Sequence, residues 1–137
     1  MKAVSYTHLD VYKRQLYYKE GKYAEAEPLY LRAIRIDGKA LGVESPAVAT
    51  DLDNMGLLLK REDKTADARD FFERALSIDE KALGPESSEV AICLTNLATL
   101  DEEEGKFADA EPLVQRADVY KRQLLQLRGP ACAGRAR

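Results

Sequence analysis

At 137 residues, with 45% apolar and 33% charged side chains, the chain is long enough to bury one hydrophobic core. This composition is typical of a soluble, helix-rich protein and excludes a disordered chain. A membrane-spanning protein is also excluded, because no apolar run approaches the ~18–20 residues that a span needs. The formal net charge is −3, and the two cysteines, Cys93 and Cys132, match no disulfide or metal-site spacing, so we expect a cytoplasmic protein.

Residues 1–15 contain no long apolar segment, so we do not expect them to be a secretory signal. They end in the hexapeptide DVYKRQ at Asp10–Gln15, and the same hexapeptide recurs at Asp118–Gln123. The identity has three possible causes: a structural repeat, a functional motif used twice, or a sequence that is foreign to the protein.

From Leu16 the chain is organised by a 42-residue repeat. The segment GKYAEAEPLYLRAIRI begins at Gly21, DKTADARDFFERALSI at Asp63 and GKFADAEPLVQRA at Gly105, so successive copies start 42 positions apart. Each unit contains two helical patterns, which we call the A helix and the B helix. About two and a half units are present, over residues 16–42, 43–84 and 85–117.

The B helices follow Gly21, Asp63 and Gly105 and place small residues around one bulky side chain, which allows two helices to approach closely. Gly42 and Gly84 stand at their ends, where a left-handed residue is favourable. The expected core positions are Ala26, Tyr30, Ala33 and Ile34, then Ala68, Phe72, Ala75 and Leu76, then Ala110, Val114 and Ala117. Pro28 and Pro112 each remove one hydrogen bond near the fifth helical residue, so we expect a slight tilt and not a break.

The A helices of the second and third units are predicted to begin at Ser45 and Ser87, because a serine hydroxyl accepts hydrogen bonds from free amides of the first turn. Pro46 falls at the first helical position, where the missing N–H has no cost. Apolar residues then follow at spacings of three and four: Val48, Leu52, Met55 and Leu59, and later Val90, Leu94 and Leu97.

These patterns resemble tetratricopeptide repeats, on the small–aromatic–small positions of the B helices and on Asn-Met-Gly at Asn54 and Asn-Leu-Ala at Asn96. The 42-residue period, with KALG between units, is similar to the subtype found in kinesin light chains. The resemblance covers about residues 16–117. It implies an all-α fold, a right-handed α-solenoid of antiparallel helix pairs, and a role in binding other proteins.

The resemblance also implies that the A helices line a concave groove, and it places ten residues there. Asn54 and Asn96 match the family's asparagine that hydrogen-bonds the backbone of a bound peptide; the alternative is that both amides bond only to a neighbouring helix. Basic residues of the chaperone-type carboxylate clamp are not matched, so a ligand with some positive charge is favoured. The expected groove residues are Thr50, Asp53, Asn54, Leu57 and Arg61, and Ile92, Thr95, Asn96, Thr99 and Glu103.

We expect no catalytic chemistry, no cofactor and no metal. The only histidine, His8, lies in the leader, so Ser-His and Cys-His nucleophile pairs are absent from the repeats. Cys93 is predicted to be a small core residue, and Asp101–Glu104 a solvated helix end. Residues 16–117 hold 13 Lys and Arg against 22 Asp and Glu, a net charge of −9, which disfavours nucleic acid and anionic membranes as partners.

The two hexapeptides start 108 positions apart, which is not a multiple of 42, so they are out of phase with the repeat. Lys13 and Arg14 stand where later units have Met55 and Gly56, and burying two unpaired cations there would cost several kcal/mol. DVYKRQ resembles the translated mosaic-end adapter of transposon-based sequencing libraries. We therefore expect residues 1–15 and 118–137 to be adapter-derived or otherwise artefactual, with the last helix continuing to about residue 127 and a disordered tail after it.

The first hypothesis is a protein-interaction module, a fragment of a larger scaffold that holds a peptide or partner helix in its groove. The alternative is a sensor or oligomerisation arm of a regulatory protein whose NTPase, protease or kinase domain lies elsewhere. Because stacked repeats usually need about three units, we also expect marginal stability and self-association through uncapped ends.

Overall fold

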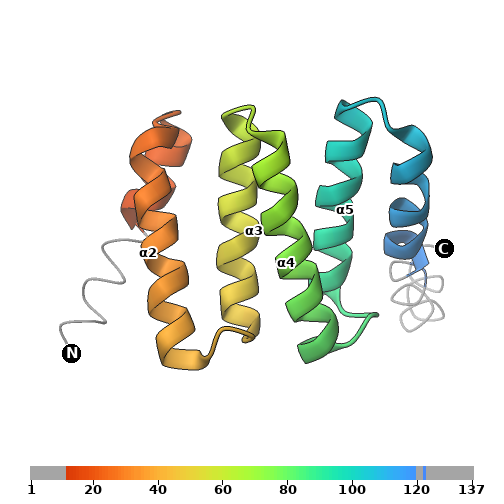
Figure 1. Ribbon diagram of the computed structural model, residues 1–137, viewed down its shortest axis with the longest axis horizontal. Coiled ribbons are helices and arrows are strands. Elements are labelled where there is room, and N and C mark those ends of the chain that lie inside the picture. The colour runs from red at the N-terminus through yellow and green to blue at the C-terminus, as the bar shows by residue number, and fades with distance from the viewer. Residues whose placement is uncertain (1–11, 120–121, 123–137) are drawn as a thin grey trace, which may run out of the picture.

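The computed structural model describes residues 12–119 and residue 122, and every regular element among them is a helix. A short helix over residues 12–19 is followed by α2 (Tyr23–Leu41), α3 (Pro46–Arg61), α4 (Thr65–Leu83), α5 (Ser88–Glu103) and a last helix over residues 107–119. The helices stand side by side in one row, and neighbours along the chain run in opposite directions (Figure 1). The predicted all-α repeat fold is confirmed.

The A helices begin where their serines predict. The Ser45 hydroxyl accepts a hydrogen bond from the Val48 amide at 3.3 Å, and the Ser87 hydroxyl accepts one from the Val90 amide at 3.2 Å. Pro46 is the first residue of α3. These caps satisfy amides that have no partner inside the helix, and they set the point at which each A helix starts.

The turns between helices depend on residues with positive φ. Gly42 and Gly84 have φ of 97° and 90°, as expected, but ψ of 147° and 156°. These values lie outside the left-handed helical region that we predicted and in a region open almost only to glycine. In the second unit Asp63 takes the place of Gly21 and Gly105 and has φ of 62°, which is costly for a residue with a side chain.

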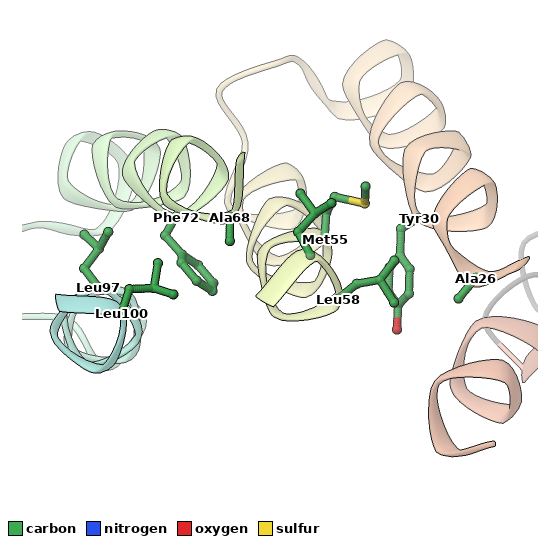
Figure 2. Close-up of a cluster of buried hydrophobic side chains, with 9 residues drawn as sticks. Ala26, Tyr30, Met55, Leu58, Ala68, Phe72, Leu97 and Leu100 are labelled. Atoms are coloured by element: carbon green, nitrogen blue, oxygen red, sulfur yellow. The ribbon is translucent and has the colours of Figure 1, made fainter. Parts of the chain in front are cut away.

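The core is built from the repeated positions of both helices. Phe72 is fully buried against α3 and α5, and Tyr30 of α2 packs toward α3 in the same way (Figure 2). Gly56 makes this possible: a Cβ there would lie 2.6 Å from the Phe72 ring. The cluster comprises Ala26, Tyr30, Met55, Leu58, Leu59, Ala68, Phe72, Leu97 and Leu100.

Some B-helix positions are less buried than predicted. Ala33, Ile34 and Leu76 are half-buried, and Val114 is exposed. Val114 has the place of Tyr30 and Phe72, which pack against the A helix of the following unit. No following A helix lies within the described residues, so the Val114 side chain has nothing to cover it.

The expectation that Lys13 and Arg14 would be two buried, unpaired cations is wrong. Lys13 is exposed. Arg14 is buried, but its guanidinium lies 3.8 Å from Asp51 and 5.1 Å from the centre of the Tyr30 ring. Nε and Nη1 of Arg14 still make no hydrogen bond. The Arg14 charge is therefore partly compensated by a carboxylate and an aromatic face, whereas the alignment alone suggested that it would be unpaired.

Pro28 lies inside α2 without breaking it, as predicted. The expected end of the last helix near residue 127 lies outside the described residues. Among the helices that the structure describes, none has the length and hydropathy needed to cross a membrane.

Candidate functional site

The ten predicted groove residues form one stripe along the A helices of units two and three. Thr50, Asp53, Asn54, Leu57 and Arg61 lie on α3, and Ile92, Thr95, Asn96, Thr99 and Glu103 lie on α5. Their spacing of three and four residues places each set on one helix face. All ten are exposed or half-buried, whereas the residues between them, such as Leu58 and Leu94, form the core.

The two asparagines have unused hydrogen-bonding capacity. Asn54 is half-buried, and its amide makes no side-chain hydrogen bond among the described residues. Asn96 is also half-buried; its nitrogen Nδ2 is shielded from solvent and lies toward Asp53, whose pKa the amide lowers, although Nδ2 makes no hydrogen bond of good geometry. The Asn54 amide and the Asn96 carbonyl oxygen therefore remain for a ligand backbone, whereas the Asn96 nitrogen does not.

The threonines of the stripe are less available than the sequence suggested. The hydroxyls of Thr50, Thr95 and Thr99 donate to the carbonyls of Pro46, Ala91 and Thr95 at 3.2, 2.9 and 2.8 Å. Each bond connects a residue to the carbonyl four positions earlier in its own helix. The three hydroxyls consequently keep accepting capacity but have already used their donor.

Polar contacts join the ends of successive A helices. Arg61 Nε donates to the Tyr18 hydroxyl at 3.1 Å, and Lys60 Nζ lies 3.2 Å from Glu103. Both contacts connect residues that are 43 positions apart, so the repeat produces the same neighbour relation twice. Neither Tyr18 nor Lys60 was predicted from the sequence as part of these contacts. The two residues are 42 positions apart and so occupy equivalent places in successive units, which is the signal that could have identified them.

Asp53 belongs to the stripe, but its carboxyl group turns inward and lies beside the thiol of Cys93. Burial raises the pKa of Asp53 to about 6; the Cys93 hydrogen bond lowers it, and the nearby Asp79 raises it. Burial and both carboxylates raise the pKa of the Cys93 thiol. The thiol is therefore protonated at neutral pH and is not an activated nucleophile. The prediction that Cys93 belongs to the core is confirmed, because the residue is fully buried.

Three surface pockets among the described residues lie away from the stripe. One of about 390 Å³ is lined by Glu73, Leu76, Ser77, Glu80 and Lys81 of α4. It is shallow, and side chains of both charge signs line it, together with the half-buried Leu76. It contains none of the ten predicted residues.

Antiparallel helix pairs with a 42-residue period and a polar A-helix stripe define an α-solenoid of the kind that binds other proteins. The family model described as tetratricopeptide repeat matches residues 15–81 and 52–117. The chain belongs to the tetratricopeptide repeat family, whose members are typically non-catalytic and mediate protein–protein interactions.

Solved structures support the same assignment. BtubC (BKLC) from P. vanneervenii is 28% identical, with a TM-score of 0.72 over 81% of this chain and 44% of that chain. A putative kinesin light chain from Podosopora anserina, with nearly identical TPR-like repeats, is 19% identical, with a TM-score of 0.77 over 91% of this chain and 59% of that chain. A second crystal structure of that protein matches equally well. The chain thus spans about half the length of these structures, and no curated protein matches it.

Proposed function

We propose that this chain binds an extended peptide or a partner helix along the A-helix stripe of α3 and α5. The observation that carries the proposal is the pair Asn54 and Asn96. They are 42 positions apart and occupy equivalent positions of successive A helices; the Asn54 amide and the Asn96 carbonyl oxygen have no hydrogen-bond partner among the described residues. An extended peptide has a free backbone donor and acceptor at each residue, which side-chain amides can match.

The composition of the stripe favours a ligand with apolar side chains and some positive charge. Leu57 is half-buried, and Ile92 is 55% exposed, so both offer apolar contact area. Asp53, Glu102 and Glu103 contribute carboxylates, of which Glu103 is already paired with Lys60. The acidic balance of residues 16–117 disfavours nucleic acid and anionic membranes, and we propose a cytoplasmic location.

Peptide-array screening of the purified chain, followed by calorimetry with the best-binding peptide, tests the proposal. Each amide that bonds the ligand backbone is worth about 1 kcal/mol net, so Asn54→Ala with Asn96→Ala should weaken binding by about 2 kcal/mol, or roughly 30-fold. Gln115→Ala is the control, since it removes an exposed amide from a B helix. Unchanged affinity in the double variant, or no binding peptide at all, contradicts the proposal.

We also propose that the module is part of a larger tetratricopeptide scaffold. Exposure of Val114, at a position that is buried in both earlier units, supports a further A helix packing there. The alternative is an arm of a regulatory protein with a separate NTPase, protease or kinase domain. The complete open reading frame distinguishes the two: further repeats alone support the scaffold, and a catalytic domain supports the arm.

A further inference from the structure

Three side chains from three different helices meet just beneath the A-helix stripe. Cys93 Sγ of α5 lies 3.3 Å from Asp53 Oδ2 of α3 and 3.6 Å from Asp79 Oδ2 of α4. One oxygen of each carboxylate and the sulfur all lie within 4.8 Å of one another. The three helices stand next to each other in the row of Figure 1, so the cluster spans the junction between units two and three.

This cluster has unmet bonding capacity in the interior. Asp79 is only 2% exposed, and its second oxygen, Oδ1, has no hydrogen-bond partner. Among the described residues, no lysine or arginine forms an ion pair with Asp53 or Asp79. Two carboxyl groups that lie in the interior against one thiol, with no basic side chain beside them, are unfavourable when ionised, and a cation bound between them would compensate their charge.

The preceding repeat junction shows what a cation does at the equivalent place. Asp37 and Asp51 stand 42 positions before Asp79 and Cys93, and they also face each other. There the guanidinium of Arg14 lies 3.8 Å from Asp51. The residue 42 positions after Arg14 is Gly56, so the second junction has no side chain that can supply the charge in this way.

We propose that Asp53, Asp79 and Cys93 bind one Zn²⁺ ion, with water or an outside ligand at the fourth coordination position. With Zn–S of about 2.3 Å and Zn–O of about 2.0 Å, the sulfur–oxygen edge of a tetrahedral site is about 3.5 Å. The two observed sulfur–oxygen distances, 3.3 and 3.6 Å, lie on either side of that value. Binding displaces the thiol proton to solvent, because the thiolate is the form that ligates a metal.

The ligand set favours zinc over the common hard cations. Ca²⁺ and Mg²⁺ prefer six or more oxygen ligands, whereas a thiolate with two carboxylates suits a borderline-soft ion. Asp53 is half-buried, whereas Asp79 and Cys93 are buried, so an outside ligand would reach the ion from the Asp53 side. The ion would link α3, α4 and α5. This inference does not depend on the proposed peptide binding.

Titration of the full chain with Co²⁺, in a Cys132→Ser background that leaves Cys93 as the only thiol, tests the site. We expect one Co²⁺ per chain with a thiolate-to-metal charge-transfer band, displaced by Zn²⁺. Cys93→Ser should abolish the band, and Asp79→Asn should weaken Co²⁺ binding at least tenfold. Asp70→Asn is the matched control, because it removes an exposed carboxylate from the same helix and should leave binding unchanged.

Circular dichroism of each variant shows whether it is folded, and Asp53→Asn provides a second test at a half-buried position if Asp79→Asn unfolds. Asp53→Asn should also weaken Co²⁺ binding at least tenfold. Zn²⁺ should raise the Tm of the Cys132→Ser protein and have no such effect on Cys93→Ser. Absence of the charge-transfer band overturns the proposal and leaves a hydrogen-bonded cluster that binds no metal. Equal Zn²⁺ binding by all variants overturns it too, as adventitious surface binding.

Discussion

Gly56→Ala is the substitution for which the structure makes the sharpest prediction. A Cβ at residue 56 would lie 2.6, 2.8 and 2.9 Å from three atoms of the Phe72 ring. Phe72 is fully buried, so the ring cannot move aside without displacing its neighbours in the core. Overpacking of this kind costs about 3 kcal/mol, from which the better helix propensity of alanine recovers about 1. We therefore expect the free energy of unfolding to fall by about 2 kcal/mol.

Gly38→Ala is the matched control, because Gly38 also lies inside a helix. Its added Cβ would meet only Val43 Cγ1, at an ordinary contact distance of 3.6 Å. Here only the gain in helix propensity applies, so this variant should be stabilised by up to about 1 kcal/mol. Urea unfolding followed by far-ultraviolet circular dichroism measures both. If Gly56→Ala is stabilised as much as Gly38→Ala, the close approach of α3 and Phe72 is refuted.

Individual contacts give three further predictions. Asp63→Gly should stabilise the protein by about 1 kcal/mol in urea unfolding, because φ of 62° suits glycine, and a destabilised variant would contradict the turn geometry. Asp101 is buried and paired with Arg69, so the prediction that it is solvated is wrong, and Arg69→Ala should cost about 3 kcal/mol because that carboxylate would lose its guanidinium partner. Arg116→Ala breaks the exposed pair with Glu80 and should cost under about 1 kcal/mol; equal losses in the two variants would refute the distinction. Sedimentation velocity should show concentration-dependent self-association that Val114→Glu reduces, and a monomer at every concentration would rule out association through that end.

Most of the candidate surface could be predicted because a repeat protein uses each position several times. A residue type that recurs every 42 positions must meet the same neighbours in each unit, so alignment of the copies separates core from surface. All ten residues of the stripe on α3 and α5 are exposed or half-buried, and their role in binding stays a prediction. Alignment could not show which polar groups of the stripe already have partners. Three threonine hydroxyls donate hydrogen bonds to carbonyls of their own helices, and Glu103 is paired with Lys60.

The sequence by itself determined the period, the helix starts at Ser45 and Ser87 and the buried faces, because caps and 3.6-residue periodicity are local properties of the chain. Only the tertiary structure decided how non-equivalent positions meet. Asp53, Asp79 and Cys93 come from three helices, and their separations are not multiples of 42. The sequence spacing therefore does not predict that they form a cluster. Arg14 likewise contacts Asp51 and Tyr30 in the folded protein, although its alignment with Gly56 predicted an unpaired charge.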